Sequence, residues 1–133
     1  MRLVNYGAGE ITDRLTILSL KMLHGKAAGK PIDHFGRERD VLLTQIRART
    51  LNGAWAEQLF DLAAVNAALW TAEDHLRIAR ARFAPPQDAR LTDGDVEDVC
   101  QLAFRIQELN DRRAELITLI NANTGEKDGE EKV

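Results

Sequence analysis

One position in the C-terminal third of the chain carries a charge where the pattern requires an apolar side chain. Arg113 belongs to a seam whose members recur at alternating spacings of three and four; the others are Val99, Leu102, Ile106, Leu109, Leu116 and Ile120. Burying a guanidinium on that face costs free energy unless a carboxylate pairs with it. We therefore predict a near-core ion pair for Arg113. The candidate partners are Glu10, Asp13, Glu73 and Asp111.

Carboxylates form a second group of polar residues, spread over three separate stretches of the chain. Glu10 and Asp13 stand three residues apart, so their side chains share one face of a helix. If they converge with the other carboxylates, the site suits magnesium, which prefers oxygen ligands. The candidate ligands are Glu10, Asp13, Glu73, Asp74 and Asp111. The alternative interpretation is that Glu10 and Asp13 serve the helix dipole and that no metal binds.

The same positions predict a polar layer between two long helices. We expect residues 93–122 to fold back on the preceding helix about a turn near residue 90. Two residues that face each other across the pair then have residue numbers that add up to about 179. Asn66 then lies level with Arg113, Trp70 lies level with Asn110, and Glu73 lies near Arg105. The layer is either a network in which every polar group has a hydrogen-bond partner, which fixes the helix register, or a ligand site. Its candidate residues are Glu10, Asp13, Asn66, Trp70, Glu73, Asp74, Asn110, Asp111 and Arg113.

The elements that must position these residues are helices separated by Gly and Pro. We predict helices over about residues 9–25, 31–50 and 93–122, and a further helix of about 30 residues between Gly53 and a turn at 84–92. Gly25 and Gly29 are expected to end the first, and Pro31 is expected to lie in the first turn of the second. Asp93 or Asp95 is expected to cap the fourth. The fold class is therefore all-α.

The last two helices are expected to form a long antiparallel hairpin with coiled-coil-like seams, on which the two shorter helices pack as a bundle. Its turn contains Pro85 and Pro86. Residues 1–123 are predicted to form a single helical domain, with an extended start over residues 1–7, and residues 124–133 a flexible charged tail. The hairpin is longer than its covering helices, which predicts that part of it is an interface.

Composition excludes several classes of function. The 133 residues carry a net charge of −3, unlike the strongly basic balance typical of nucleic-acid binders, so we expect no nucleic-acid partner. The apolar run at Leu15–Leu20 is too short to span a membrane. Cys100 is the only cysteine, which excludes an internal disulfide and favours the cytoplasm. Phosphate-loop, zinc-helix and nucleophile-elbow motifs are absent, and His24, His34 and His75 are expected to have separate surface roles.

Three separated blocks of the chain resemble a family of short bacterial all-helical proteins without an assigned function. The blocks are Gly9-Glu10-Ile11-Thr12-Asp13, Val65-Asn66-Ala67-Ala68-Leu69-Trp70 followed by Glu73-Asp74, and Asn110-Asp111-Arg112-Arg113. Related sequences have Lys where this chain has Arg14, and they have a longer ending. The resemblance brings no activity to carry over, but it implies that the three blocks belong together.

These patterns favour a non-catalytic cytoplasmic helical oligomer or protein-interaction module. A homodimer that buries parts of the two long helices is the simplest form, and an unidentified protein partner is a further option. The alternative is a small magnesium-dependent enzyme or ligand-binding protein, by analogy with all-α nucleotide pyrophosphohydrolases. The chain lacks the tandem Glu-x-x-Glu pattern of those enzymes. The sequence names no catalytic residue and no substrate.

Overall fold

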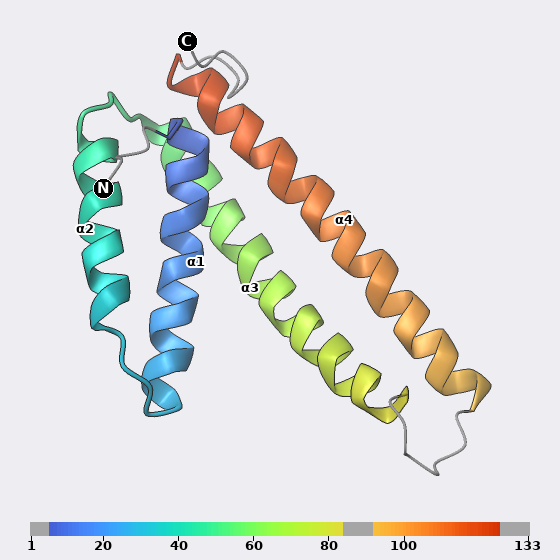
Figure 1. The fold of residues 1–133 in the computed structure, drawn as a ribbon. Coiled ribbons are helices and arrows are strands. Elements are labelled where there is room, and N and C mark those ends of the chain that lie inside the picture. Colours follow the sequence, from blue (N-terminus) through green and yellow to red (C-terminus); the bar gives the residue numbers. More distant parts are fainter. Residues whose placement is uncertain (1–5, 84–91, 126–133) are drawn as a thin grey trace.

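The structure is a computed structural model that describes residues 6–83 and 92–125. Over these residues the chain forms four helices: α1 (Ala8–Ala27), α2 (Asp33–Arg47), α3 (Gly53–Phe83) and α4 (Asp93–Asn123). The long helices α3 and α4 lie side by side as an antiparallel pair, and α1 packs against both (Figure 1). The all-α bundle predicted from periodicity is confirmed.

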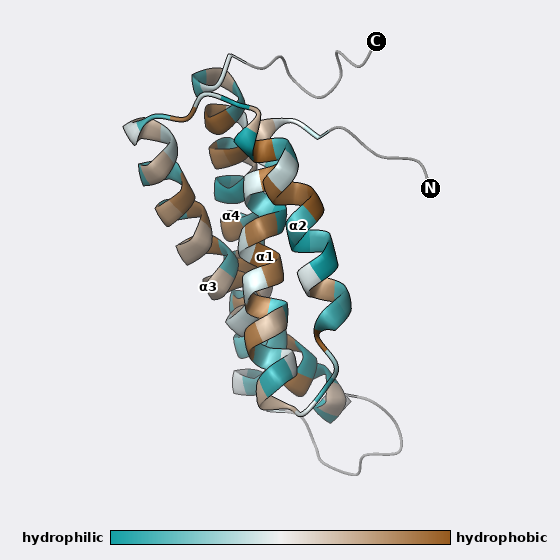
Figure 2. Ribbon diagram, turned by 90° about the vertical axis from the view of Figure 1, so that its left-hand side faces the viewer, coloured by the Kyte–Doolittle hydropathy of each residue, from teal (hydrophilic) through white to brown (hydrophobic). Residues whose placement is uncertain are grey.

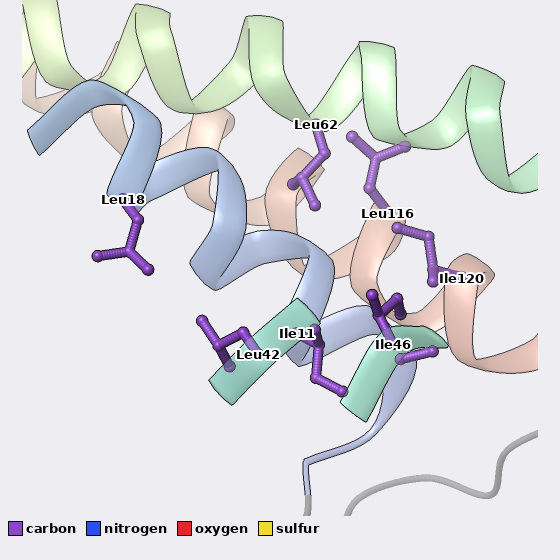
Figure 3. Packing of buried hydrophobic residues seen from close by; sticks show 8 residues of the cluster. Ile11, Leu18, Leu42, Ile46, Leu62, Leu116 and Ile120 are labelled. Atoms are coloured by element: carbon purple, nitrogen blue, oxygen red, sulfur yellow. The ribbon is translucent and has the colours of Figure 1, made fainter. Parts of the chain in front are cut away.

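Helix α1 is the centre of the bundle. It lies between α2 and α3 when the molecule is seen from the side (Figure 2), and it also contacts α4, whereas α1 is the only one of the other described helices that α2 contacts. Buried side chains from all four helices meet around it, as the close view in Figure 3 shows. Ile11, Leu62, Leu116 and Ile120 are the largest apolar side chains that are fully buried. Each contributes roughly 1.5–3 kcal/mol through burial, so this cluster anchors α1 on the hairpin.

Four predicted helix boundaries need correction. The second helix ends at Arg47 and not near residue 50. Helix α1 runs through Gly25 to Ala27, and the chain then turns at Gly29, whose φ of 72° suits a residue without a Cβ. Helix α2 begins at Asp33, so Pro31 lies before the helix and not in its first turn. The N-cap of α4 is Thr92 and not Asp93 or Asp95, because the Thr92 hydroxyl accepts a hydrogen bond from the backbone N–H three residues later.

Asp95 still takes part in the start of α4. Its backbone N–H donates to Thr92 Oγ1 at 3.1 Å, and its own carboxylate accepts from the Thr92 N–H at 2.9 Å. This reciprocal arrangement satisfies two backbone donors that a helix end leaves open. The predictions for the first five residues, for the turn at residues 84–91 and for the tail after Gly125 fall outside the described residues.

The hairpin continues past the helices that cover it (Figure 1). No described residue of α3 after Ala72, and none of α4 before Leu116, is buried. We call residues 75–82 of α3 with residues 93–104 of α4 the outer end of the hairpin. Its seam residues Leu76, Ala79, Val99 and Leu102 are only half-buried. The described part of the chain contains no helix that is both long and apolar enough to cross a membrane.

Candidate functional site: a polar contact between three helices

The Asp13 carboxylate joins α1 to both helices of the hairpin. Arg113 donates from Nε to Oδ1 at 2.8 Å and from Nη2 to Oδ2 at 2.6 Å, a bidentate pair. Asn66 of α3 donates from Nδ2 to the same Oδ1 at 2.9 Å. The Asp13 side chain is 7% exposed and that of Arg113 is 34% exposed. The predicted ion pair of Arg113 is confirmed, and among the four candidates its partner is Asp13.

These groups meet because α1 packs against both α3 and α4. One turn after Asp13, Thr16 accepts a bond from Asn66 Nδ2 at 2.7 Å and donates to the Asp13 carbonyl at 2.7 Å. The hydrogen bond to Asp13 raises the pKa of Arg113, although burial opposes the shift; the charges of Asp13 and Glu73 also raise it. A guanidinium held in this way carries no transferable proton at physiological pH. The arrangement is suited to fixing helix register.

A second polar contact joins the start of α1 to the end of α4. Gly9 N–H donates to Asn121 Oδ1 at 2.8 Å, and Asn121 Nδ2 lies 3.4 Å from both carboxylate oxygens of Glu10. Gly7, at the N-cap of α1, offers no side chain to the first turn. The buried Asn121 therefore supplies from another helix the acceptor that an N-cap side chain normally provides.

Gly9 allows this contact because its backbone lies against α4. A Cβ at that position would clash with the backbone carbonyl oxygen of Ile117 and would come within 2.9 Å of Ile117 Cγ2. The sequence interpretation missed both Asn121 and this close approach. The available signals were the small residues Gly7, Ala8 and Gly9 at a helix start, and an asparagine directly after the last seam residue.

The remaining predicted site residues do not join Asp13. Glu73, Asn110 and Asp111 are exposed, and Asp74 pairs with Arg77 at 2.8 Å. Trp70 stacks on His24 with ring centroids 4.6 Å apart. Within residues 6–83 and 92–125, no three His, Cys, Asp or Glu side chains form a group that could hold a metal ion. The magnesium hypothesis required three of the five carboxylates to converge, so the described residues do not support it.

Two of the larger hollows on the described surface are places where another molecule could contact the chain. An apolar groove of about 890 Å³ runs over α1 between α2 and α3; Leu15, Leu43, Trp55 and Phe60 are among its lining residues. A cavity of about 770 Å³ lies where α1 ends, α2 begins and α3 passes. Its side chains are mainly cationic and aromatic, and they include both His24 and His34, which the sequence interpretation had kept apart.

Comparison with known proteins adds no relative. The chain matches no family model, and neither the curated proteins nor the solved structures contain a significant match.

Proposed function

We propose that the protein is a non-catalytic helical interaction module that forms a homodimer through the outer end of the hairpin. The observation that carries the proposal is the absence of buried residues among the described residues of this end, although its seam follows the same spacing as the buried part. Two helices alone cannot enclose an apolar seam, whereas four can. A second hairpin therefore supplies the cover that α1 supplies elsewhere.

The exposed apolar side chains of the outer end support this interpretation. Ile78 is 60% exposed, Val96 is 47% exposed and Phe104 is 68% exposed. A single exposed apolar residue needs no explanation, but several along one uncovered stretch are typical of an interface.

Charge complementarity favours a second copy as the occupant. The α3 side of the outer end carries Arg77, Arg80 and Arg82, whereas α4 begins with Asp93, Asp95, Glu97 and Asp98. In a dimer whose two turns lie at the same end, the α3 edge of one copy meets the α4 edge of the other. Opposite charges then face each other on both sides of the two-fold axis. The dimer is expected in the cytoplasm, because its exposed Cys100 has no partner for an internal disulfide.

Sedimentation over micromolar to millimolar protein tests the proposal. We expect the wild type to shift towards twice its monomer mass as concentration rises, and we expect Phe104→Glu or Ile78→Glu to remain monomeric. Phe60→Glu is the matched control, because Phe60 is 76% exposed on α3 but lies at the apolar groove and not at the outer end. A monomeric wild type at millimolar concentration contradicts the proposal. So does a dimer that Phe60→Glu disrupts and Phe104→Glu leaves intact.

A further inference from the structure

The cavity at the junction of α1, α2 and α3 combines cationic and aromatic side chains. Lys21 and His24 come from the last turns of α1, Lys30 from the connection to α2, His34 from the first turn of α2, and Trp70 from α3. Its volume of about 770 Å³ lies in the range of small-molecule sites. None of these residues takes part in the Asp13 contact.

The charge of the cavity is opposite to that of the whole chain. Among the described residues, Asp74 is the only carboxylate that lines it, and Arg77 pairs with that carboxylate at 2.8 Å. Lys21 and Lys30 therefore leave the cavity cationic, although the protein as a whole carries −3. The Lys21 ammonium lies 5.9 Å from the centroid of the Phe35 ring, a cation–π position that holds it at the cavity wall. An anionic group is the ligand chemistry that this surface attracts.

The aromatic side chains add a stacked pair of rings beside the lysines. The Trp70 and His24 rings are stacked with an angle of 6° between their planes, and His24 is an exposed side chain. One face of each ring is occupied by the other, so a further planar ring can stack on an outer face of the pair, because aromatic faces prefer offset parallel contact. The pair belongs to the cavity, since Trp70 and His24 both line it, as does Phe35.

We propose that this cavity binds a small molecule in which a planar aromatic ring carries a negatively charged group. The ring stacks on an outer face of the Trp70–His24 pair, and the charged group meets Lys21 and Lys30. Both a nucleoside monophosphate and an aromatic carboxylate have this chemistry. The inference is independent of dimer formation, because none of the residues that line the cavity belongs to the outer end.

Tryptophan fluorescence provides a direct readout. The chain has two tryptophans, so Trp55→Phe leaves Trp70 as the only reporter. We expect adenosine monophosphate or benzoate to change its fluorescence saturably at or below millimolar concentration, and the stronger of the two identifies the phosphate or carboxylate source. Adenosine alone and inorganic phosphate alone lack one half of the chemistry, and each should bind about tenfold more weakly or worse.

A pair of lysine variants separates this site from general electrostatic attraction. In the Trp55→Phe background, Lys21→Ala combined with Lys30→Ala should weaken binding by about tenfold or more. Lys26→Ala is the matched control, because Lys26 lies on the same helix end but does not line the cavity. Circular dichroism confirms that each variant keeps its helices.

Several outcomes overturn the proposal. They are the absence of a saturable change with both probes, equal binding of adenosine or phosphate alone, and equal losses in the control and in the double variant.

Discussion

The two ends of the α3–α4 hairpin have the same apolar spacing but different surroundings. We call residues 62–72 of α3 with residues 113–121 of α4 the inner end of the hairpin. There α1 packs against both helices, and Leu62, Leu116 and Ile120 are buried. At the outer end, Leu76, Val99 and Leu102 occupy equivalent seam positions and remain half-buried. The comparison shows that seam periodicity specifies which helices pair, whereas enclosure of the seam requires a further helix. The inner end obtains that helix from its own chain.

Polar contacts add a second difference between the two ends. At the inner end, Asn66 and Arg113 both donate hydrogen bonds to the Asp13 carboxylate, and Asn121 joins α4 to the first turn of α1. These bonds satisfy buried polar groups only when α1 sits at one height and one rotation, so they specify its position. At the outer end, the hydrogen bonds that the structure describes lie within single helices or at the start of α4. None of these hydrogen bonds between described residues joins α3 to α4.

The largest expected effect follows from removing the cation of the inner end. Arg113→Ala leaves the buried Asp13 carboxylate with only its bond from Asn66, and should lower the free energy of unfolding by about 3 kcal/mol. Arg112→Ala is the control, because Arg112 makes an exposed pair with Glu115 at 3.3 Å, worth about 0–1 kcal/mol. Urea unfolding measures both. Equal losses in the two variants would show that the inner contact does not hold α1.

The close approach of α1 and α4 should be nearly as sensitive. Gly9→Ala forces a Cβ against the Ile117 carbonyl, so the helices must separate, at a cost of about 2–3 kcal/mol. Gly36→Ala in α2 is the matched substitution, since a Cβ there meets no atom within 4 Å. It should raise stability by about 0.5–1 kcal/mol through helix propensity. Thermal unfolding compares the two, and a stable Gly9→Ala protein would contradict the packing described for α1.

A smaller effect is expected at the start of α4. Thr92→Ala removes the side-chain acceptor of the Asp95 N–H and should cost about 1 kcal/mol. Because the outer end has few tertiary contacts, the loss should appear as fraying of the first turns of α4. Amide exchange of residues 95–98 measures this fraying. Unchanged exchange there, or an equal rise in exchange at Leu116, would show that the capping bonds do not act locally.

The smallest effect concerns pH. The bond from the Thr92 N–H to the Asp95 carboxylate is the main cause that lowers the pKa of Asp95 below its ordinary value of 3.8. The stabilisation of α4 by this bond is therefore fully present above pH 3.8, and it is lost as the pH falls through the lower pKa that Asp95 has in the folded protein. Asp95→Asn should remove this acid-dependent loss of helix at the start of α4. Carboxylate chemical shifts followed during an acid titration measure it, and an unshifted Asp95 titration would refute the bond.

The sequence was sufficient to predict the four helices approximately and an ion pair for Arg113, and the physical reasons differ. Spacings of three and four predict the seams directly, because they place side chains on one helical face. The sequence limited the partner of Arg113 to four carboxylates, because a buried charge requires an oppositely charged partner. Choosing Asp13 among them needed the position of α1 relative to both long helices, which depends on contacts between residues about one hundred positions apart.

The parts that the sequence did not reveal are those that depend on close backbone approach or on chain reversal. Gly9 looked like a helix start, and only the position of α4 shows why no Cβ fits there. His24 and His34 looked unrelated because they stand on different helices, and the turn at Gly29 brings them to one cavity. Pro31 marked the second helix two residues too early, since a proline before a helix and one in its first turn have the same local signal.

Amide hydrogen exchange measured at several protein concentrations tests the central claim most directly, because it reports the two ends of the hairpin in one experiment. The account predicts that protection at the outer end, at residues 76–82 and 96–102, rises with protein concentration as the second copy covers it. Protection at the inner end, around Leu62 and Leu116, should stay constant over the same range. Protection of the outer end that does not change with concentration would contradict the claim that a second copy completes the hairpin.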